Sequence, residues 1–266
     1  MVLDLFILNI KWIIRDRVLQ ALAGVAVLFL LLIPAFSVLS MRQVQELSIT
    51  LSLSFISFVL LVFSTLLGAS SIWRDVEKRY TSSLLTLPHS RGSYVLSKFL
   101  AISAGITASA ILLFIVAAVT VVISSGLYQS TSPIRWVHFI NAVFFDVLKY
   151  ILLAAIAILL SSFSTSFFLP IFGTISLLIA GNASQEVFDF VTTNAANSKL
   201  PTMLQYAAKG LYYLLPNFGA FNYKVFAIYP VQLDMTGVFY TFLYFIIYTG
   251  IVLVISVNVF SRREFP

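Results

Sequence analysis

The sequence contains no cysteine, and only 10% of its 266 residues are charged. The missing cysteines exclude a disulfide-stapled secreted module, thiol redox chemistry and thiolate metal sites. A soluble domain has about 25% charged residues, whereas this chain is 60% hydrophobic. A globular fold of this size could not keep so much apolar side chain away from water. The composition therefore predicts an all-α integral membrane protein.

Long intervals without charge predict the membrane spans, because a helix needs about 20 apolar residues to cross the hydrocarbon. Four such intervals hold one span each. The interval from Lys149 to Glu186 is too long for one span, and the polar run 161–166 followed by Pro170 divides it in two. We predict six spans, at about 18–39, 48–72, 95–124, 141–162, 167–181 and 237–260.

The few charges predict the orientation of these spans. With the N-terminus inside, ten basic residues lie on the cytoplasmic side and five on the outside, which obeys the positive-inside rule. We therefore expect a multi-pass membrane protein with both termini in the cytoplasm. The net charge of +6 then reports basic cytoplasmic loops and gives no support to a nucleic-acid partner.

Residues 1–266 form a single transmembrane domain in this interpretation, with three segments outside the spans. Residues 1–17 are amphipathic and predict a helix in the cytoplasmic interface; the alternative is a frayed leader. Residues 74–94 form a basic cytoplasmic loop with a short apolar helical segment. Residues 182–236 are extracellular, and their apolar stretch 203–221 predicts helices on or in the outer leaflet.

The loop at 74–94 carries the most specific pattern in the chain. On physical grounds, a short amphipathic helix there either rests on the membrane or docks into a groove of a partner protein. Seven residues at characteristic spacing make up the pattern: Glu77, Leu84, Leu85, Pro88, Ser90, Arg91 and Lys98. With this pattern the chain resembles the permease subunits of type-2 ABC exporters, the small bacterial six-span kind.

Further segments share the resemblance, which covers most of the chain. They are Arg15-Asp16-Arg17, Ser161-Ser162, Leu215-Pro216-Asn217-Phe218 and the C-terminal run 260–265. One departure lies in the loop, where Arg79-Tyr80-Thr81 stands in place of the Gly-Thr-Leu typical of the family.

The resemblance implies a homodimeric path driven by two copies of a separate cytoplasmic ATPase. The loop would be the coupling helix that contacts this ATPase, through Glu77, Arg79, Leu84, Leu85, Pro88, Ser90 and Arg91. ATP and Mg²⁺ would belong to the partner, and this chain would hold no cofactor, metal or catalytic residue. The sequence agrees, because it has no Gly-x-x-x-x-Gly-Lys-Ser/Thr phosphate loop. His89 and His138 fall on opposite sides of the predicted membrane and cannot form one metal site.

Two sets of side chains are candidates for the path or the dimer seam. Asp146 and Lys149 share one helix face and are expected to be paired and to face inward; alternatively both lie at the outer headgroups, Lys149 snorkelling and Asp146 wet. Tyr240, Tyr244 and Tyr248 form a stripe on the last span. The stripe either lines a path for an amphipathic substrate or packs against neighbouring helices.

Two other classes of protein remain as alternatives. An ATP-independent channel or secondary carrier predicts inverted-repeat halves or interrupted helices, and no convincing repeat is found. A membrane-embedded lipid-modifying enzyme requires an acidic or histidine cluster at one interface, and none is seen. The apolar outer segment and the aromatic last span favour a hydrophobic or amphipathic cargo for a transporter.

Overall fold

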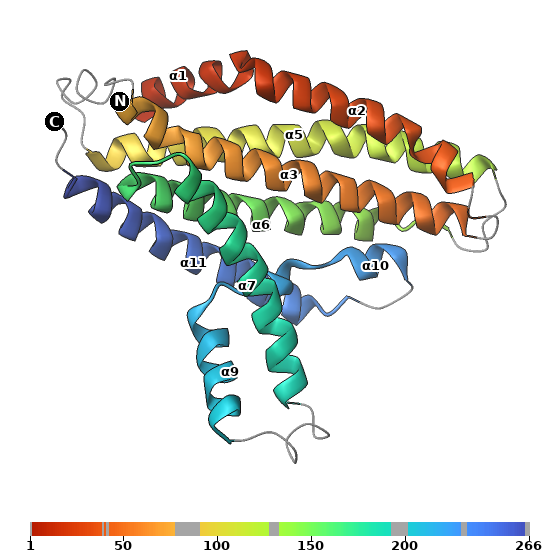
Figure 1. The fold of residues 1–266 in the computed structure, drawn as a ribbon. Coiled ribbons are helices and arrows are strands. Elements are labelled where there is room, and N and C mark those ends of the chain that lie inside the picture. The colour runs from red at the N-terminus through yellow and green to blue at the C-terminus, as the bar shows by residue number, and fades with distance from the viewer. Residues whose placement is uncertain are drawn as a thin grey trace.

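The computed structural model describes residues 2–38, 40, 43–77, 91–127, 133–192, 202–229 and 233–263. In these ranges every regular element is a helix (Figure 1). Six helices are long and apolar enough to cross a membrane. They are α2 (Arg17–Val38), α3 (Val44–Glu77), α5 (Arg91–Leu127), α6 (Trp136–Phe163), α7 (Phe168–Thr192) and α11 (Met235–Ser261). The predicted all-α fold with six spans is confirmed.

Four shorter helices complete the described part of the chain. They are α1 (Val2–Arg15), α9 (Thr202–Leu214), η1 (Gly219–Phe221) and α10 (Lys224–Ile228). The N- and C-termini lie at the same end of the bundle (Figure 1), as an even number of spans requires. We call this the terminal end and the opposite one the distal end.

Helix α6 forms the centre of the bundle and is the most buried of the six spans. It contacts α3, α5, α7 and α11 as well as the short helices η1 and α10. Its middle, residues 152–158, is apolar and buried on every side, which is the pattern of a helix surrounded by other helices. α2 and α11 have few buried residues and form the periphery.

Small residues allow α3 and α6 to approach closely. A Cβ atom on Gly68 would collide with the Cβ of Ala157 and would lie 3.1 Å from the carbonyl oxygen of Ala154. Contacts of this kind between small residues are the usual way in which membrane helices gain van der Waals energy. The small side chains at these positions therefore determine the distance between the two most buried spans.

We expect the substitution Gly68→Val to destabilise the protein by about 1–3 kcal/mol, the usual effect of overpacking a core. Gly24→Val in α2 is the matched control, because a Cβ atom on Gly24 would have no other atom within 4 Å. Thermal unfolding of the two variants in detergent tests the prediction. Equal transition temperatures for both would contradict it.

Helix α7 is longer than the predicted span 167–181, because it continues to Thr192. Glycine and asparagine at 181–182 favour an end of the span at this point when the sequence is considered alone. Gly181 is instead inside the helix, where a Cβ would collide with the carbonyl oxygen of Pro216. The predicted extracellular segment 182–236 thus begins within a helix. α7 runs obliquely away from the bundle and α9 lies beside it (Figure 1).

The amphipathic N-terminal segment is helical, and α1 packs against α5. Leu5 and Asn9 are buried on that side. The charged stripe of Asp4, Lys11 and Arg15 is exposed. A third face carries the exposed apolar side chains Leu3, Ile7 and Ile14. This division into three faces suits a helix at the boundary of protein, lipid and water.

Candidate functional site

The candidate site lies at the terminal end, where the loop predicted to be the coupling helix joins α3 to α5. α3 ends at Glu77, which is exposed, and α5 begins at Arg91. Residues 78–90 are outside the described ranges. Five predicted contact residues fall there and stay predictions: Arg79, Leu84, Leu85, Pro88 and Ser90. The structure does describe the two helices from which the loop emerges.

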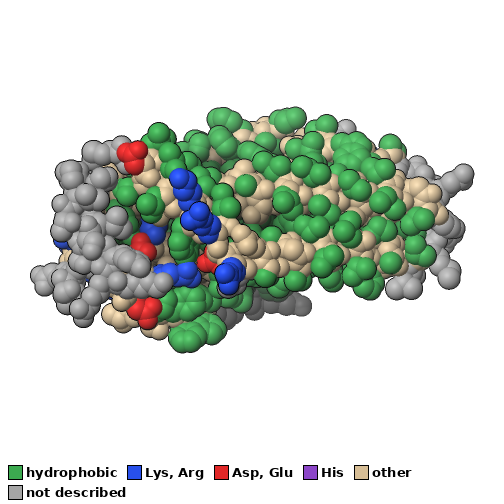
Figure 2. Space-filling view, turned by 90° about the horizontal axis from the view of Figure 1, so that it is seen from above, with side chains coloured by type: hydrophobic (Ala, Val, Ile, Leu, Met, Phe, Trp, Pro, Cys, Tyr) green, Lys and Arg blue, Asp and Glu red, His purple; other side chains and the backbone are tan. Residues whose placement is uncertain are grey.

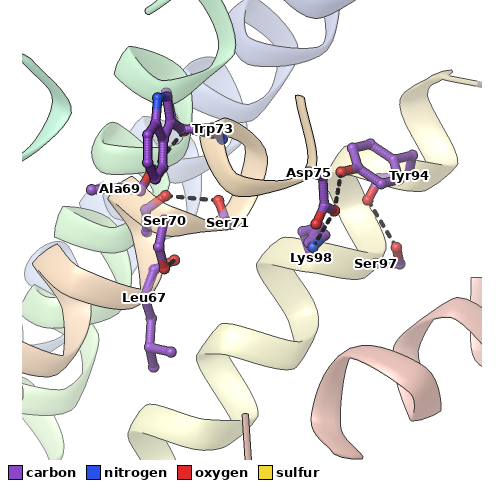
Figure 3. Close-up of polar contacts among 11 residues, drawn as sticks. Leu67, Ala69, Ser70, Ser71, Trp73, Asp75, Tyr94, Ser97 and Lys98 are labelled. Atoms are coloured by element: carbon purple, nitrogen blue, oxygen red, sulfur yellow. Dashed lines mark hydrogen bonds and ion pairs between the residues drawn. The ribbon is translucent and has the colours of Figure 1, made fainter. Parts of the chain in front are cut away.

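The carboxylate of Asp75 joins these two helices. Its Oδ2 lies 2.7 Å from Nζ of Lys98 and accepts a 2.6 Å hydrogen bond from the hydroxyl of Tyr94 (Figure 3). Lys98 is only 8% exposed and Tyr94 is 4% exposed, so both contacts are shielded from water. We call Asp75, Tyr94 and Lys98 the loop clamp, because they hold the helix before the loop to the helix after it.

The clamp also contacts the last span. The ring of Tyr94 stacks on Phe260 of α11, with 5.3 Å between the centroids. Arg91 donates from Nη1 to the carbonyl oxygens of Ser261, at 2.7 Å, and Arg263, at 3.1 Å. A cation at these carbonyls satisfies groups that the end of α11 leaves unpaired and favours its dipole. Within the chain, Arg91 thus caps α11; its predicted contact with an ATPase stays a prediction.

Arg263 extends these contacts to the turn between α6 and α7. Its Nη1 donates to the carbonyl of Ser162 at 2.8 Å and its Nη2 to the carbonyl of Ser164 at 3.0 Å. Partial burial lowers the pKa of Arg263, yet a guanidinium stays protonated at any physiological pH. The end of α11 is therefore tied to α5 on one side and to the α6–α7 turn on the other.

Trp73 connects α3 directly to the same turn. Its backbone N–H donates to the hydroxyl of Ser161 at 3.0 Å, and that hydroxyl donates to the carbonyl of Ala69 at 2.9 Å. The indole nitrogen donates to the carbonyl of Thr165 at 3.3 Å. Figure 3 shows Trp73 and Ala69 close together on α3. The final turns of α3 are thus bonded to α6 and to the α6–α7 turn.

Arg74, the next residue, reaches the junction of α1 and α2. Its guanidinium lies 3.4 Å from the carboxylate of Asp16 and 4.5 Å from the ring centre of Trp12. With this contact, polar or aromatic interactions join the last turns of α3 to α1, α5, α6 and the α6–α7 turn. The end of α3 next to the loop is therefore bonded to four neighbouring elements.

A second polar cluster lies deep between α3, α6 and α10. Asp146 of α6 is 2% exposed, and its Oδ2 lies 3.7 Å from Nζ of Lys224, the first residue of α10. The hydroxyl of Ser57 in α3 donates to the same carboxylate. We call Asp146, Lys224 and Ser57 the buried lock. Asp146 stands ten residues, about 15 Å along the axis, from the first residue of α6.

The lock holds a segment, residues 215–229, whose short helices η1 and α10 pack against α6. Phe218 and Phe221 are completely buried, and Tyr223 stacks on Phe145 at 4.1 Å. The amide of Asn217 donates to Gln185 at 2.5 Å, and its side-chain oxygen accepts from the N–H of Ala220 at 3.1 Å. Irregular backbone at such depth is tolerated only where protein satisfies its polar groups, and these contacts do so.

The model of one protein family matches residues 9–265, with the description "ABC-2 family transporter protein". The chain belongs to the ABC-2 transporter family. Its members are membrane components of ABC transporters, so this multi-pass chain is a permease whose family associates with an ABC ATPase. A comparison with individually curated proteins finds no match.

In the ABC-2 permease, Asp146 and Lys149 share a face of the fourth span but do not form an ion pair with each other. Asp146 has Lys224 as its ion-pair partner, whereas Lys149 is half-buried with Nζ 5.7 Å from the ring centre of Tyr150. Sequence reasoning misses Lys224, because it places this lysine in the outer segment. The sequence feature that could have indicated Lys224 is its position as the single lysine of an aromatic run, 221–229, that contains no acidic residue.

The tyrosine stripe of the permease is divided between two environments. The hydroxyl of Tyr244 accepts a 2.9 Å hydrogen bond from the N–H of Asn217, and the rings of Tyr244 and Tyr248 lie 5.4 Å apart. Tyr240 is 63% exposed. Tyr244 therefore holds the 215–229 segment, while Tyr240 faces the surface. In the described ranges no group of three or more His, Asp or Glu side chains is placed to hold a metal ion.

Proposed function

We propose that this ABC-2 permease is the membrane subunit of an ATP-driven exporter. Two copies of a separate ATPase would dock beneath the terminal end, which would face the cytoplasm of a prokaryotic inner membrane, and the loop between α3 and α5 would be their contact. The loop clamp is the observation that carries the proposal. Because Asp75 joins both flanking helices across a 2.7 Å ion pair, a push on the loop would move them together, as a rigid-body switch requires.

The path is expected between two copies of the chain rather than within one. The buried apolar side chains of α6 fill the centre of a single bundle. α2 and α11 lie at its periphery. α11 carries a broad apolar surface that one copy leaves uncovered, including Phe239, Leu243 and Ile247. These features support a homodimer with the peripheral spans at its seam.

The cargo is expected to be hydrophobic or amphipathic. Helix α9, which packs against α7, exposes an aromatic and apolar surface that includes Met203, Tyr206 and Tyr213. Such a surface favours contact with lipid or with a lipid-like molecule over contact with water. ATP and Mg²⁺ would be bound by the ATPase, and this subunit would hold neither.

Co-purification with a candidate ATPase tests the docking contact. We expect Leu84→Asp and Glu77→Arg each to reduce the yield of the complex at least about tenfold, as loss of a central interface contact does. The matched controls are Leu214→Asp and Glu186→Arg, at exposed positions on α9 and α7, which should leave the yield unchanged. Full complex formation by both loop variants would refute the coupling assignment.

A further inference from the structure

A cleft of about 260 Å³ at the terminal end has walls and charges that suit an amphiphile. Leu19 of α2, Leu66 and Leu67 of α3, and Phe167 of the α6–α7 turn form its apolar walls. Arg74 and Asp16 supply its polar side. Arg74 follows Leu67 by seven residues, about two helical turns, so the charges lie nearer the terminal end than the apolar walls do.

The surface beside this cleft has an excess of positive charge. Figure 2 shows Lys and Arg side chains near the terminal end, with Asp and Glu side chains among them and hydrophobic side chains covering the surface beyond. Lys11, Arg15 and Arg17 are exposed, and none forms an ion pair with an acid in the described part of the chain. Arg74 is paired with Asp16 at 3.4 Å.

The apolar surroundings of these cations distinguish a membrane ligand from a soluble acidic partner. Leu3, Ile7 and Ile14 of α1 are 45–67% exposed on the face next to the charged stripe. A soluble protein docked on the cations would leave these side chains in water. A phospholipid supplies both an anionic headgroup for the cations and acyl chains for the apolar face.

We propose that the cleft binds an anionic phospholipid of the leaflet at the terminal end. Its phosphate would lie against Arg17 and Arg74, and one acyl chain would follow Leu19, Leu66 and Phe167. The ring of Trp12, 4.5 Å from the guanidinium of Arg74, holds this cation at the cleft. This site is independent of the ATPase and of the identity of the cargo.

The native tryptophans allow a direct test. Trp12 lies beside Arg74, and Trp73 lies 4.9 Å from Phe167 between ring centres, so both report on the cleft. The third tryptophan, Trp136, begins α6 at the distal end and is removed by Trp136→Phe. The protein is reconstituted into bilayers of phosphatidylcholine and phosphatidylglycerol with equal acyl chains, one of the two lipids brominated in each sample.

We expect fluorescence quenching to give a relative binding constant for phosphatidylglycerol over phosphatidylcholine of about five, the effect of one basic residue at an anionic surface. Arg17→Gln and Arg74→Gln should lower this ratio toward one. Leu66→Phe, which fills the cleft without altering charge, should reduce the quenching by both lipids. Lys209→Gln removes one exposed cation on α9 and should leave the ratio unchanged.

Three results would overturn the proposal. A ratio near one in the parent protein would mean that the cleft does not select anionic lipid. An unchanged ratio in Arg17→Gln would place the selectivity elsewhere, since this exposed side chain has no ion pair with the described acids and its loss should not affect folding. If neither brominated lipid quenched the tryptophan fluorescence, the cleft would be covered by protein, such as a second copy of the chain.

Discussion

Replacing Lys224 with methionine is expected to destabilise the permease by about 3–5 kcal/mol, since it leaves a buried carboxylate without its ion-pair partner. Asp146 is 2% exposed, and among the described residues only Lys224 and Ser57 bond its side chain. Without the lysine, the segment 215–229 loses its charged attachment to α6. Thermal unfolding in detergent should show the loss of stability, and limited proteolysis should cut the segment faster.

A double mutant separates the ion pair from the packing around it. In Asp146→Asn/Lys224→Met neither charge remains, so we expect most of the stability lost in Lys224→Met to return. Lys209→Met is the matched control, because it removes an exposed cation on α9. A double mutant no more stable than Lys224→Met would show that the charges are not what holds the segment.

Replacing Lys98 with methionine is expected to uncouple the bundle from the ATPase without preventing their association. The change leaves Asp75 with Tyr94 as its remaining partner in the loop clamp, so α3 and α5 are no longer held together by a charged contact. The docking surface of the loop is untouched. This expectation rests on the proposed function, and co-purification checks the docking separately from the coupling.

The absence of native cysteine makes the movement measurable without knowledge of the cargo. Tyr240→Cys places one thiol on the exposed side of α11, and its rate of labelling should change when the complex binds ATP. We expect Lys98→Met to reduce this change at least about tenfold, equivalent to a coupling free energy of about 1.4 kcal/mol. Lys209→Met should behave as the parent does. An undiminished response in Lys98→Met would refute the role of the clamp.

The boundaries of the spans follow from the sequence except where a distant segment contacts the backbone. The predicted spans agree with the helices at both ends of the chain because charge-free length is a local property. The predicted fifth span is too short. Gly181 considered alone favours the end of a helix, but in the structure it lies inside α7 against Pro216. Nothing near residue 181 in the sequence indicates a contact with residue 216.

The candidate sites divide in the same way. The residue pattern of the loop is enough to find it, and the clamp beneath it includes Lys98, which belongs to that pattern. The partner of Asp146 cannot be found by such a pattern. Spacing along a helix favours Lys149, whereas the lysine that reaches the carboxylate is Lys224, brought there by the return of the chain into the bundle.

The scarcity and placement of charge in the sequence determined the class of protein, the number of spans and the shared end of the two termini. The cost of placing charge in hydrocarbon acts on each segment separately, so a linear pattern records it. Only the tertiary structure decided which polar groups satisfy one another: Asp75 with Lys98, Arg91 and Arg263 with the helix ends, and Asp146 with Lys224. Those pairings depend on the packing of helices around α6, because a buried polar group bonds whichever partner that packing brings within reach.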